Sequence, residues 1–338
     1  MKSSIYIYLF ILFITISCSK SSTQDDVDGL SLTLNYEWTV PLKDIVGSFN
    51  PFPFAENPTM STVSNVEGLN DESTVVIVSF NDKVNIYPLT FVQPFETVND
   101  NLSNTHFTIS YCPITQSTLA INRKLGSDNL TFRASGILYK ENLVMHDANS
   151  DSFWSQMLLK SIKGPFENET LKTFPLIETS WKTAKTYFPN ANVFTNKSIV
   201  SSKNSTLQKS TDNITSNEKV FGFIDNLNNK VSDVFIYRYS QFENGIKLYN
   251  SGFRTKKIVI GSSELKFITS FFNDENYIFK PIQNEFPIVM SDQLGNNWDA
   301  FGLAISGPNK GKQLIPATGF IAAWWAWQDF YTSFTFVE

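Results

Sequence analysis

Short apolar runs separated by polar turn residues recur along most of the chain. The clearest runs are rich in Val, Ile, Thr and Phe, and runs of this kind and length predict β-strands. Asn-Asp, Gly-Ser and Asn-Asn pairs separate them, as turns do. The predicted strands are Val75–Phe80, Phe107–Cys112, Thr118–Asn122, Ile258–Gly261 and Lys266–Ser270.

Helical spacing of apolar residues is rarer and occurs late in each half of the chain. One predicted helix covers Glu178–Phe188, with Trp181 and Ala184 on its apolar face and a stop at Pro189. The other covers Phe320–Phe330 and carries Trp324 and Trp327 on one stripe. The pattern therefore predicts an α+β fold in which strands dominate and each unit ends in a helix.

The two halves look like copies of one another. Residues 143–194 and 288–337 share a series of matched positions in the same order, which indicates an internal repeat. The predicted units are 36–194 and 220–338, joined by a linker or long exposed loop at 195–219 that is rich in Ser, Thr and Asn. The matches are Val144-Met145 with Val289-Met290, Asp147 with Asp292, Trp154 with Trp298, Gly164-Pro165 with Gly307-Pro308, and Trp181 with Trp324.

The N-terminus has the pattern of an export signal. An apolar run over residues 5–16 is too short to span a bilayer, and Cys18 follows it as in a bacterial lipobox. We expect a lipoprotein signal peptide at 1–17, a lipid on Cys18 that tethers the protein to a membrane, and a flexible tether at 18–35. Ser19 favours the outer membrane of a bacterial envelope. The alternatives are an ordinary signal peptide cut nearby or an uncleaved anchor.

Composition narrows the classes of function. The formal charge is −5 and the basic residues are scattered, so we expect no nucleic-acid partner. With Cys18 lipidated, Cys112 has no cysteine to pair with, so the fold must depend on its core. The chain supplies 30 Phe, 12 Tyr and 7 Trp for such a core. The apolar stretch IAAWWAWQDF is too short to span a membrane.

Four segments together resemble an uncharacterised bacterial and archaeal family called domain of unknown function 3179. They are VIVSFNDKVNIYPL, TISYCPITQST, GILYKENLVMHDANSDSFWSQ and GPFENETLKTFPLIETSWKTAKTYFPNANVF. The resemblance runs from about Trp38 to Phe194 and more weakly to the end of the chain. It implies no activity. Family members have a second cysteine at the position of Thr115 and His-Glu where this chain has Phe95-Glu96, so two of three groups of any such metal or redox site are missing here.

Cys112 is the one candidate for thiol chemistry. Pro113 is favoured at a first helical position, and a helix N-terminus lowers the pKa of a thiol. Glu96, Asn99 and Asp100 lie near Cys112 in the family pattern, which makes them weak candidates beside it. The favoured reading is a small buried side chain at the end of a strand, without chemistry. A zinc site is excluded because only His106 and His146 exist to complete it, and we predict no metal and no cofactor.

Two other polar motifs, at His146-Asp147 and at Asp147–Asp151, could be either functional or structural. His146 and Asp147 are adjacent on an extended segment and point to opposite faces, so they do not orient each other as a catalytic pair. Asp147, Asn149 and Asp151 have calcium-loop spacing but lack the Gly and Glu that complete such a loop. A recurring Asp after a strand is more often a turn residue.

The repeated tryptophans are either core residues or platforms that stack on sugars. Trp325 and Trp327 have no first-half counterpart, which makes them better candidates for an exposed surface or the seam between the units, but packing in the core is still the favoured reading. The leading hypothesis is a non-enzymatic, envelope-anchored lipoprotein that binds a small molecule, a glycan or a partner at the seam of two related halves. A thiol-dependent enzyme or redox protein centred on Cys112 is the alternative. The candidate binding residues are Asn99, Tyr111, Asp147 and Trp154.

Overall fold

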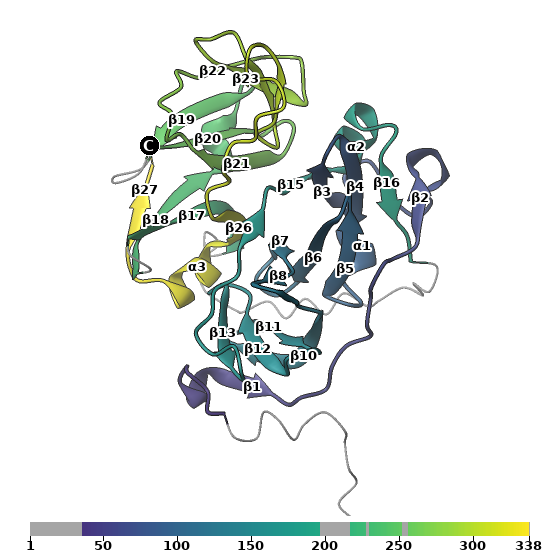
Figure 1. Ribbon diagram of the computed structural model, residues 1–338, viewed down its shortest axis with the longest axis vertical. Coiled ribbons are helices and arrows are strands. Elements are labelled where there is room, and N and C mark those ends of the chain that lie inside the picture. Colours follow the sequence, from purple (N-terminus) through teal and green to yellow (C-terminus); the bar gives the residue numbers. More distant parts are fainter. Residues whose placement is uncertain (1–35, 197–216, 228–229, 252–255, 338) are drawn as a thin grey trace, which may run out of the picture.

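The computed structural model describes residues 36–196, 217–227, 230–251 and 256–337 (Figure 1). The predicted leader, its tether and most of the linker at 195–219 lie outside the described residues. Strands dominate, and the helices are short, so the prediction of a strand-dominated α+β fold is confirmed. None of the helices in the described part of the chain is long and apolar enough to cross a membrane.

All five strands that the sequence predicts are present, and each observed strand end lies within two residues of the predicted end.

The first half of the chain forms three main sheets. In spatial order, the first sheet is β15 (Ile177–Ser180), β3 (Thr74–Phe80), β4 (Lys83–Pro88), β16 (Asn192–Phe194) and β2 (Met60–Thr62). The second is β14 (Thr173–Phe174), β7 (Ser117–Asn122), β6 (Thr105–Cys112) and β5 (Thr97–Leu102). The third is β1 (Ile45–Gly47), β10 (Phe132–Tyr139), β11 (Asn142–Asp147), β12 (Ser152–Ser155) and β13 (Lys160–Lys163). A small hairpin joins β8 (Lys124–Leu125) and β9 (Asp128–Asn129).

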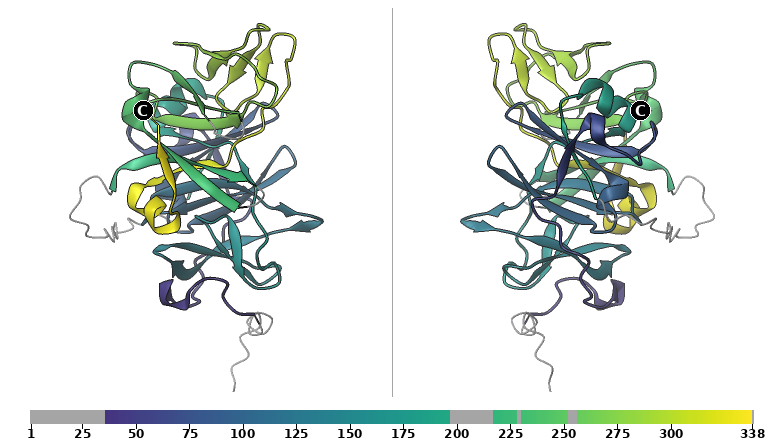
Figure 2. Two further views of the ribbon diagram at one scale, coloured as in Figure 1. Left: turned by 90° about the vertical axis from the view of Figure 1, so that its left-hand side faces the viewer. Right: turned by 90° about the vertical axis from the view of Figure 1, so that its right-hand side faces the viewer.

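The second half repeats this organisation with fewer strands. Its first sheet is β26 (Gly319–Ala323), β17 (Lys219–Leu227), β18 (Lys230–Arg238) and β27 (Phe334–Phe336). Its second is β19 (Lys247–Ser251), β20 (Lys257–Ser262) and β21 (Phe267–Phe272). Its third is β22 (Lys280–Pro281), β23 (Ile288–Ser291), β24 (Asn297–Asp299) and β25 (Ala304–Ser306). Figure 2 shows the β22–β25 sheet at one end of the molecule and the β10–β13 sheet at the other.

Strand directions correspond as well as strand order. In each first sheet the two central strands are antiparallel, and the strand after the helix returns parallel to one of them: β16 to β4, and β27 to β18. The repeated Gly-Pro pair also has one geometry. A Cβ at Gly164 would lie 2.7 Å from the Ser152 Cα, and a Cβ at Gly307 would lie 2.6 Å from the Asn296 Cα. Both glycines have positive φ, so only glycine fits. A duplicated unit would produce this correspondence.

Both predicted helices are shorter than the sequence pattern indicates. Helix α2 covers Trp181–Tyr187 and α3 covers Trp324–Phe330. The residues before Trp181 belong to β15, whose backbone pairs with β3 from Ile177 to Ser180. Ser180 then caps α2 by accepting from the Thr183 N–H. The expectation that each unit ends in a helix is also wrong, because β16 and β27 follow the two helices.

Both helices also contact the other half. Helix α2 reaches the second half, where the Tyr187 ring lies 5.1 Å from that of Phe286. Helix α3 packs on the first half, where the Phe330 ring lies 5.4 Å from that of Tyr139. Immediately after α3, the Tyr331 hydroxyl donates to the Met157 carbonyl at 2.7 Å. Each helix therefore packs on the first sheet of its own half and also contacts the other half.

The apolar core is shared for the same reason. One buried cluster combines Ile77 and Trp181 of the first half with Trp298 of the second. Another combines Trp154 of the first half with Trp327 of the second. Since burial of apolar surface is the main driving force for folding, the two halves depend on one another for stability.

Candidate functional site

Cys112 lies at the end of β6 with only 1% of its surface exposed. Residues 113–116 form a turn that leads into β7, so the predicted helix after Cys112 is absent. Burial raises the pKa of the thiol, and the nearby Glu96 carboxylate raises it further. The raised pKa disfavours the thiolate that nucleophilic chemistry requires.

Ser262 of the second half corresponds to Cys112 and indicates the structural role of Cys112. Ser262 ends β20 before a turn of equal length, and its hydroxyl accepts from the Leu265 N–H three residues later at 3.3 Å. The Cys112 sulfur makes the same kind of contact with the backbone of Thr115. Cys112 therefore stabilises a hairpin turn, which a hydroxyl does equally well in the other half.

A fully buried polar network surrounds this turn, and no periodic pattern in the sequence predicted it. Asn142 donates to the Thr115 hydroxyl at 2.9 Å and to the Gln156 carbonyl oxygen at 2.8 Å. Gln156 in turn donates to the Ser110 hydroxyl at 3.0 Å, and Ser117 donates to Gln156 at 2.6 Å. Because these groups satisfy one another, the network fixes the hairpin against β11 and leaves no reactive group free.

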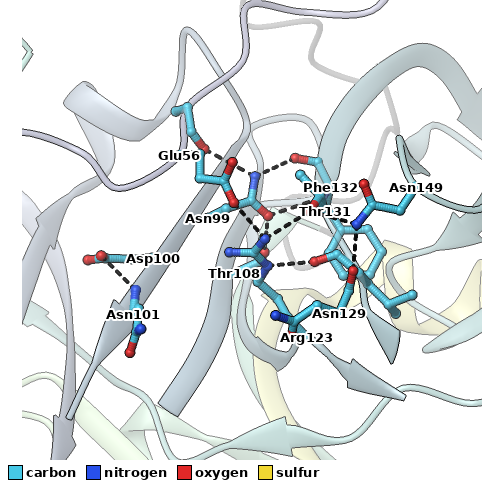
Figure 3. A network of polar contacts seen from close by, with 12 residues as sticks. Glu56, Asn99, Asp100, Asn101, Thr108, Arg123, Asn129, Thr131, Phe132 and Asn149 are labelled. Atoms are coloured by element: carbon cyan, nitrogen blue, oxygen red, sulfur yellow. Dashed lines mark hydrogen bonds and ion pairs between the residues drawn. The ribbon is translucent and has the colours of Figure 1, made fainter. Parts of the chain in front are cut away.

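Asn99 ties three segments together rather than facing a ligand (Figure 3). Its amide nitrogen donates to the carbonyls of Phe132 at 2.7 Å and Ala55 at 3.1 Å. Its amide oxygen accepts from Thr108 at 2.6 Å and from the Phe132 N–H at 3.0 Å. Both ends of the side chain are satisfied, so Asn99 has a structural role.

Asp100 faces the opposite side of β5 from Asn99. It accepts hydrogen bonds from the Tyr87 hydroxyl and, at 3.2 Å, from Asn85. Burial raises the pKa of Asp100, although these hydrogen bonds favour its charged form. Cys112 and Asp100 therefore belong to separate buried networks in the described structure.

Asp147 and its counterpart Asp292 are turn residues. Asp147 accepts from the backbone N–H of Thr131 at 2.6 Å and of Ser150 at 3.0 Å. Asp292 accepts from the Leu294 N–H at 2.8 Å and from the Trp298 indole at 3.0 Å. Each carboxylate thus organises the loop that follows its strand.

His146 pairs with Asp151 instead of its neighbour Asp147. The two side chains meet at 2.6 Å, and burial lowers the pKa of the imidazole. This geometry agrees with the expectation that adjacent strand residues do not orient one another. Among the described residues, no group of three or more His, Cys, Asp or Glu side chains is arranged to hold a metal ion.

The repeated tryptophans lie in the core. Trp154 and Trp298 are fully buried and cannot stack on an external sugar. Trp325 and Trp327 are buried as well, in the cluster that combines residues of both halves. The favoured prediction for this pair, packing in the core, is therefore confirmed, and the exposed-surface alternative is wrong. Trp324 is only partly buried.

Glu96 is an uncompensated acid beside Cys112. It precedes β5 with φ +55°, and its carbonyl accepts from the Tyr111 N–H at 2.7 Å. Burial raises the pKa of its carboxyl to about 8. Burial also raises the pKa of Tyr111, with further contributions from Glu178 and Cys112. Glu178 thus lies close enough to Tyr111 to affect its ionisation.

Glu178 is a buried acid at a cleft that both halves form. Its side chain is on β15 and only 5% of the residue is exposed. One carboxylate oxygen pairs with Lys219 of β17, and the other is buried without a hydrogen-bond partner in the described residues. The adjoining cleft has a volume of about 380 Å³. Its walls are Glu72, Thr74, Glu178, Thr179, Ser180, Lys219, Tyr239, Ser263 and Lys266.

The cleft lies where the two halves correspond. Ser180 pairs with Thr74 at the start of β3, and Ala323 pairs with Lys219 at the start of β17, so Thr74 and Lys219 occupy matching positions. A smaller cavity of about 30 Å³ lies on the other side of Glu178, between β7, β21 and β26. Sequence reasoning placed Glu178 at a helix start and missed it as a site residue, because only the pairing of the halves brings Lys219 to it.

Comparisons with known proteins give a family but no activity. Neither the curated proteins nor the solved structures contain a match to this chain. A family model with the description "Protein of unknown function (DUF3179)" matches residues 50–334, which includes both halves and the cleft between them. The chain therefore belongs to the DUF3179 family.

Proposed function

We propose that this protein binds a small polar molecule in the cleft between its halves and acts without chemistry of its own. The carrying observation is the Glu178 oxygen that is buried beside the cleft without a partner. A buried, unsatisfied acceptor costs free energy, and a ligand that donates a hydrogen bond to it recovers that cost. The cleft is within the size range of small-molecule sites.

The lining indicates the chemistry of the ligand. Lys219 pairs with Glu178, and Lys266 pairs with Glu72 at 2.6 Å, so the charges of the cleft are balanced. Hydroxyl groups of Thr74, Ser180, Ser263 and Tyr239 are on its walls. A neutral molecule with hydroxyl or amino donors fits this lining, and sugars belong to that class.

We further propose that the protein is a lipoprotein held on the bacterial envelope, and on its outer membrane, through Cys18. The support is the sequence pattern around Cys18 alone. Membrane fractionation of wild type and Cys18→Ser tests it, with the variant expected in the soluble fraction. Recovery of both proteins in the membrane fraction would contradict a lipid anchor at this residue.

The binding proposal is tested with monosaccharides and amino acids as probes in a thermal-shift screen. A ligand raises the melting temperature by mass action, and its dissociation constant is then measured by calorimetry. Glu178→Gln is expected to weaken binding about tenfold, since one charge-assisted hydrogen bond is replaced by a weaker one. Glu72→Gln is the matched control, because its exposed carboxyl lies at the same cleft. Equal affinities in the two variants would exclude Glu178 as the ligand-binding group.

The thiol alternative has no observation in its favour. Cys112 is buried and its pKa is raised. In the second half, the equivalent Ser262 makes the same kind of contact with the backbone of its turn.

A further inference from the structure

The first sheet of the first half has one strand more than the first sheet of the second half. Beyond β16 the first half adds β2, whereas no strand lies beyond β27 in the described part of the second half. We propose that the outer edge of β27 is a docking site for an extended segment of a partner protein, which adds to the sheet as an antiparallel strand. This inference is independent of the cleft and of its ligand.

The occupied edge in the first half gives the expected geometry. Strand β16 runs parallel to β4, and β2 then pairs with β16 antiparallel, with Val193 opposite Ser61. Strand β27 runs parallel to β18 in the same way. Its outer edge therefore presents the same strand direction to an incoming chain as the edge that β2 covers.

Backbone groups on the outer edge of β27 are available for pairing. The Ser333 carbonyl accepts from Val234 at 3.0 Å, and the Val337 N–H donates to Ile236 at 3.2 Å. Residues alternate in direction along a strand, so Phe334 and Phe336 direct their N–H and C=O groups away from β18. Unpaired edge groups of this kind are templates for another strand.

Aromatic side chains beside the edge supply a contact for the incoming strand. Phe336 is 47% exposed, and its ring lies 5.0 Å from that of Trp324. Phe334 contacts the same indole at 4.9 Å. The guanidinium of Arg238 lies 5.8 Å from the Phe336 ring. The partner segment is thus expected to be short, to have no proline at the positions that pair with β27, and to have an apolar residue that faces these rings. Met60 of β2 is such an apolar residue at the other edge.

A second copy of this chain fits the edge less well than a separate segment. Strand β27 has only three residues, and two copies paired edge to edge would share only this short ladder. The matching edge in the first half is filled by an isolated three-residue strand that belongs to a long irregular segment, not by the edge of another sheet.

The test uses the full-length protein and a fluorescein-labelled peptide with the sequence of residues 57–65, NPTMSTVSN, which contains β2. Fluorescence anisotropy is expected to show saturable binding that a scrambled peptide lacks. Hydrogen exchange is expected to slow at Phe334 and Phe336 when the peptide binds. Phe336→Pro removes the outward N–H and is expected to weaken binding about tenfold.

Phe336→Ala is the matched control, because it loses the ring but keeps the N–H, and it is expected to bind more tightly than Phe336→Pro. Circular dichroism establishes that both variants fold. Three results would overturn the proposal. They are no binding of the peptide to wild type, binding that appears only after deletion of residues 200–213, and a wild-type dimer that Phe336→Pro dissociates. Binding only after the deletion would mean that a segment of the same chain covers this edge. A dimer that Phe336→Pro dissociates would mean that a second copy of the chain covers it.

Discussion

The raised pKa of Glu96 is expected to make the folded protein less stable as the pH rises from 5 to 8. Burial raises the pKa of this carboxyl from 4.5 to about 8 in the folded chain, whereas the unfolded chain keeps the ordinary value. Between these two values the unfolded chain has released a proton that the folded chain still holds. Stability therefore falls with increasing pH, and this loss is complete once the pH passes the folded pKa.

The size of the effect follows from the shift. At about 1.4 kcal/mol per pKa unit, the full shift corresponds to about 5 kcal/mol of unfolding free energy, which is an upper bound. Glu96 is partly exposed, so water reaches the carboxyl and reduces the penalty. We expect about 2 to 3 kcal/mol between pH 5 and pH 8.

The assay is urea unfolding followed by tryptophan fluorescence at several pH values from 5 to 8. Glu96→Gln keeps the shape of the side chain and removes its titration, so its stability advantage over wild type is expected to grow with pH. Other groups titrate in this range, among them Asp299, whose pKa burial raises to about 6, but they are common to both proteins. Glu167→Gln, at an exposed position, is the control. Parallel stability profiles for wild type and Glu96→Gln would refute the reasoning.

Three further predictions concern stability and reactivity. Cys112 is expected to resist a thiol reagent in the native protein and to react in urea, and rapid native labelling, followed by mass spectrometry, would contradict its burial. Lys257→Met leaves Asp225 buried without its cation and is expected to cost about 3 to 5 kcal/mol in urea unfolding. Lys266→Met, at an exposed pair, is its control and is expected to cost about 1 kcal/mol at most. Gly164→Ala is expected to lower the melting temperature more than Gly126→Ala, since both have positive φ but only Gly164 has backbone within 3 Å of the new Cβ. Equal decreases in melting temperature would show that the strain of a positive φ, and not the contacts of the new Cβ, causes the loss of stability.

The sharing of the apolar clusters between the halves has a consequence for folding. Trp181 and Trp327 are each buried in a cluster to which both halves contribute. The contacts that close these clusters link residues far apart in sequence, and such contacts form late and slowly. Folding therefore requires most of the chain before either main cluster is closed.

The sequence by itself determined the local elements that depend on nearby residues. The Val-rich and Ile-rich runs predicted β3, β6, β7, β20 and β21, because strands that are buried on both faces require such side chains. The order of matched residues from Val144 to Trp324 indicated a repeat, and the strand order of the sheets corresponds in the same way.

Only the tertiary structure decided where the elements end and which residues meet. The helical pattern around Trp181 begins three residues early in the sequence, because β15 gains backbone pairing with β3 that the pattern does not contain. The sequence favoured a buried Cys112 at the end of a strand, but only the structure showed its turn and its serine counterpart. Lys219 is the last residue of the predicted linker but the first residue of β17, and its contact with Glu178 depends on how two sheets pack. Long-range contacts of this kind leave no local periodicity, so the sequence did not disclose the cleft.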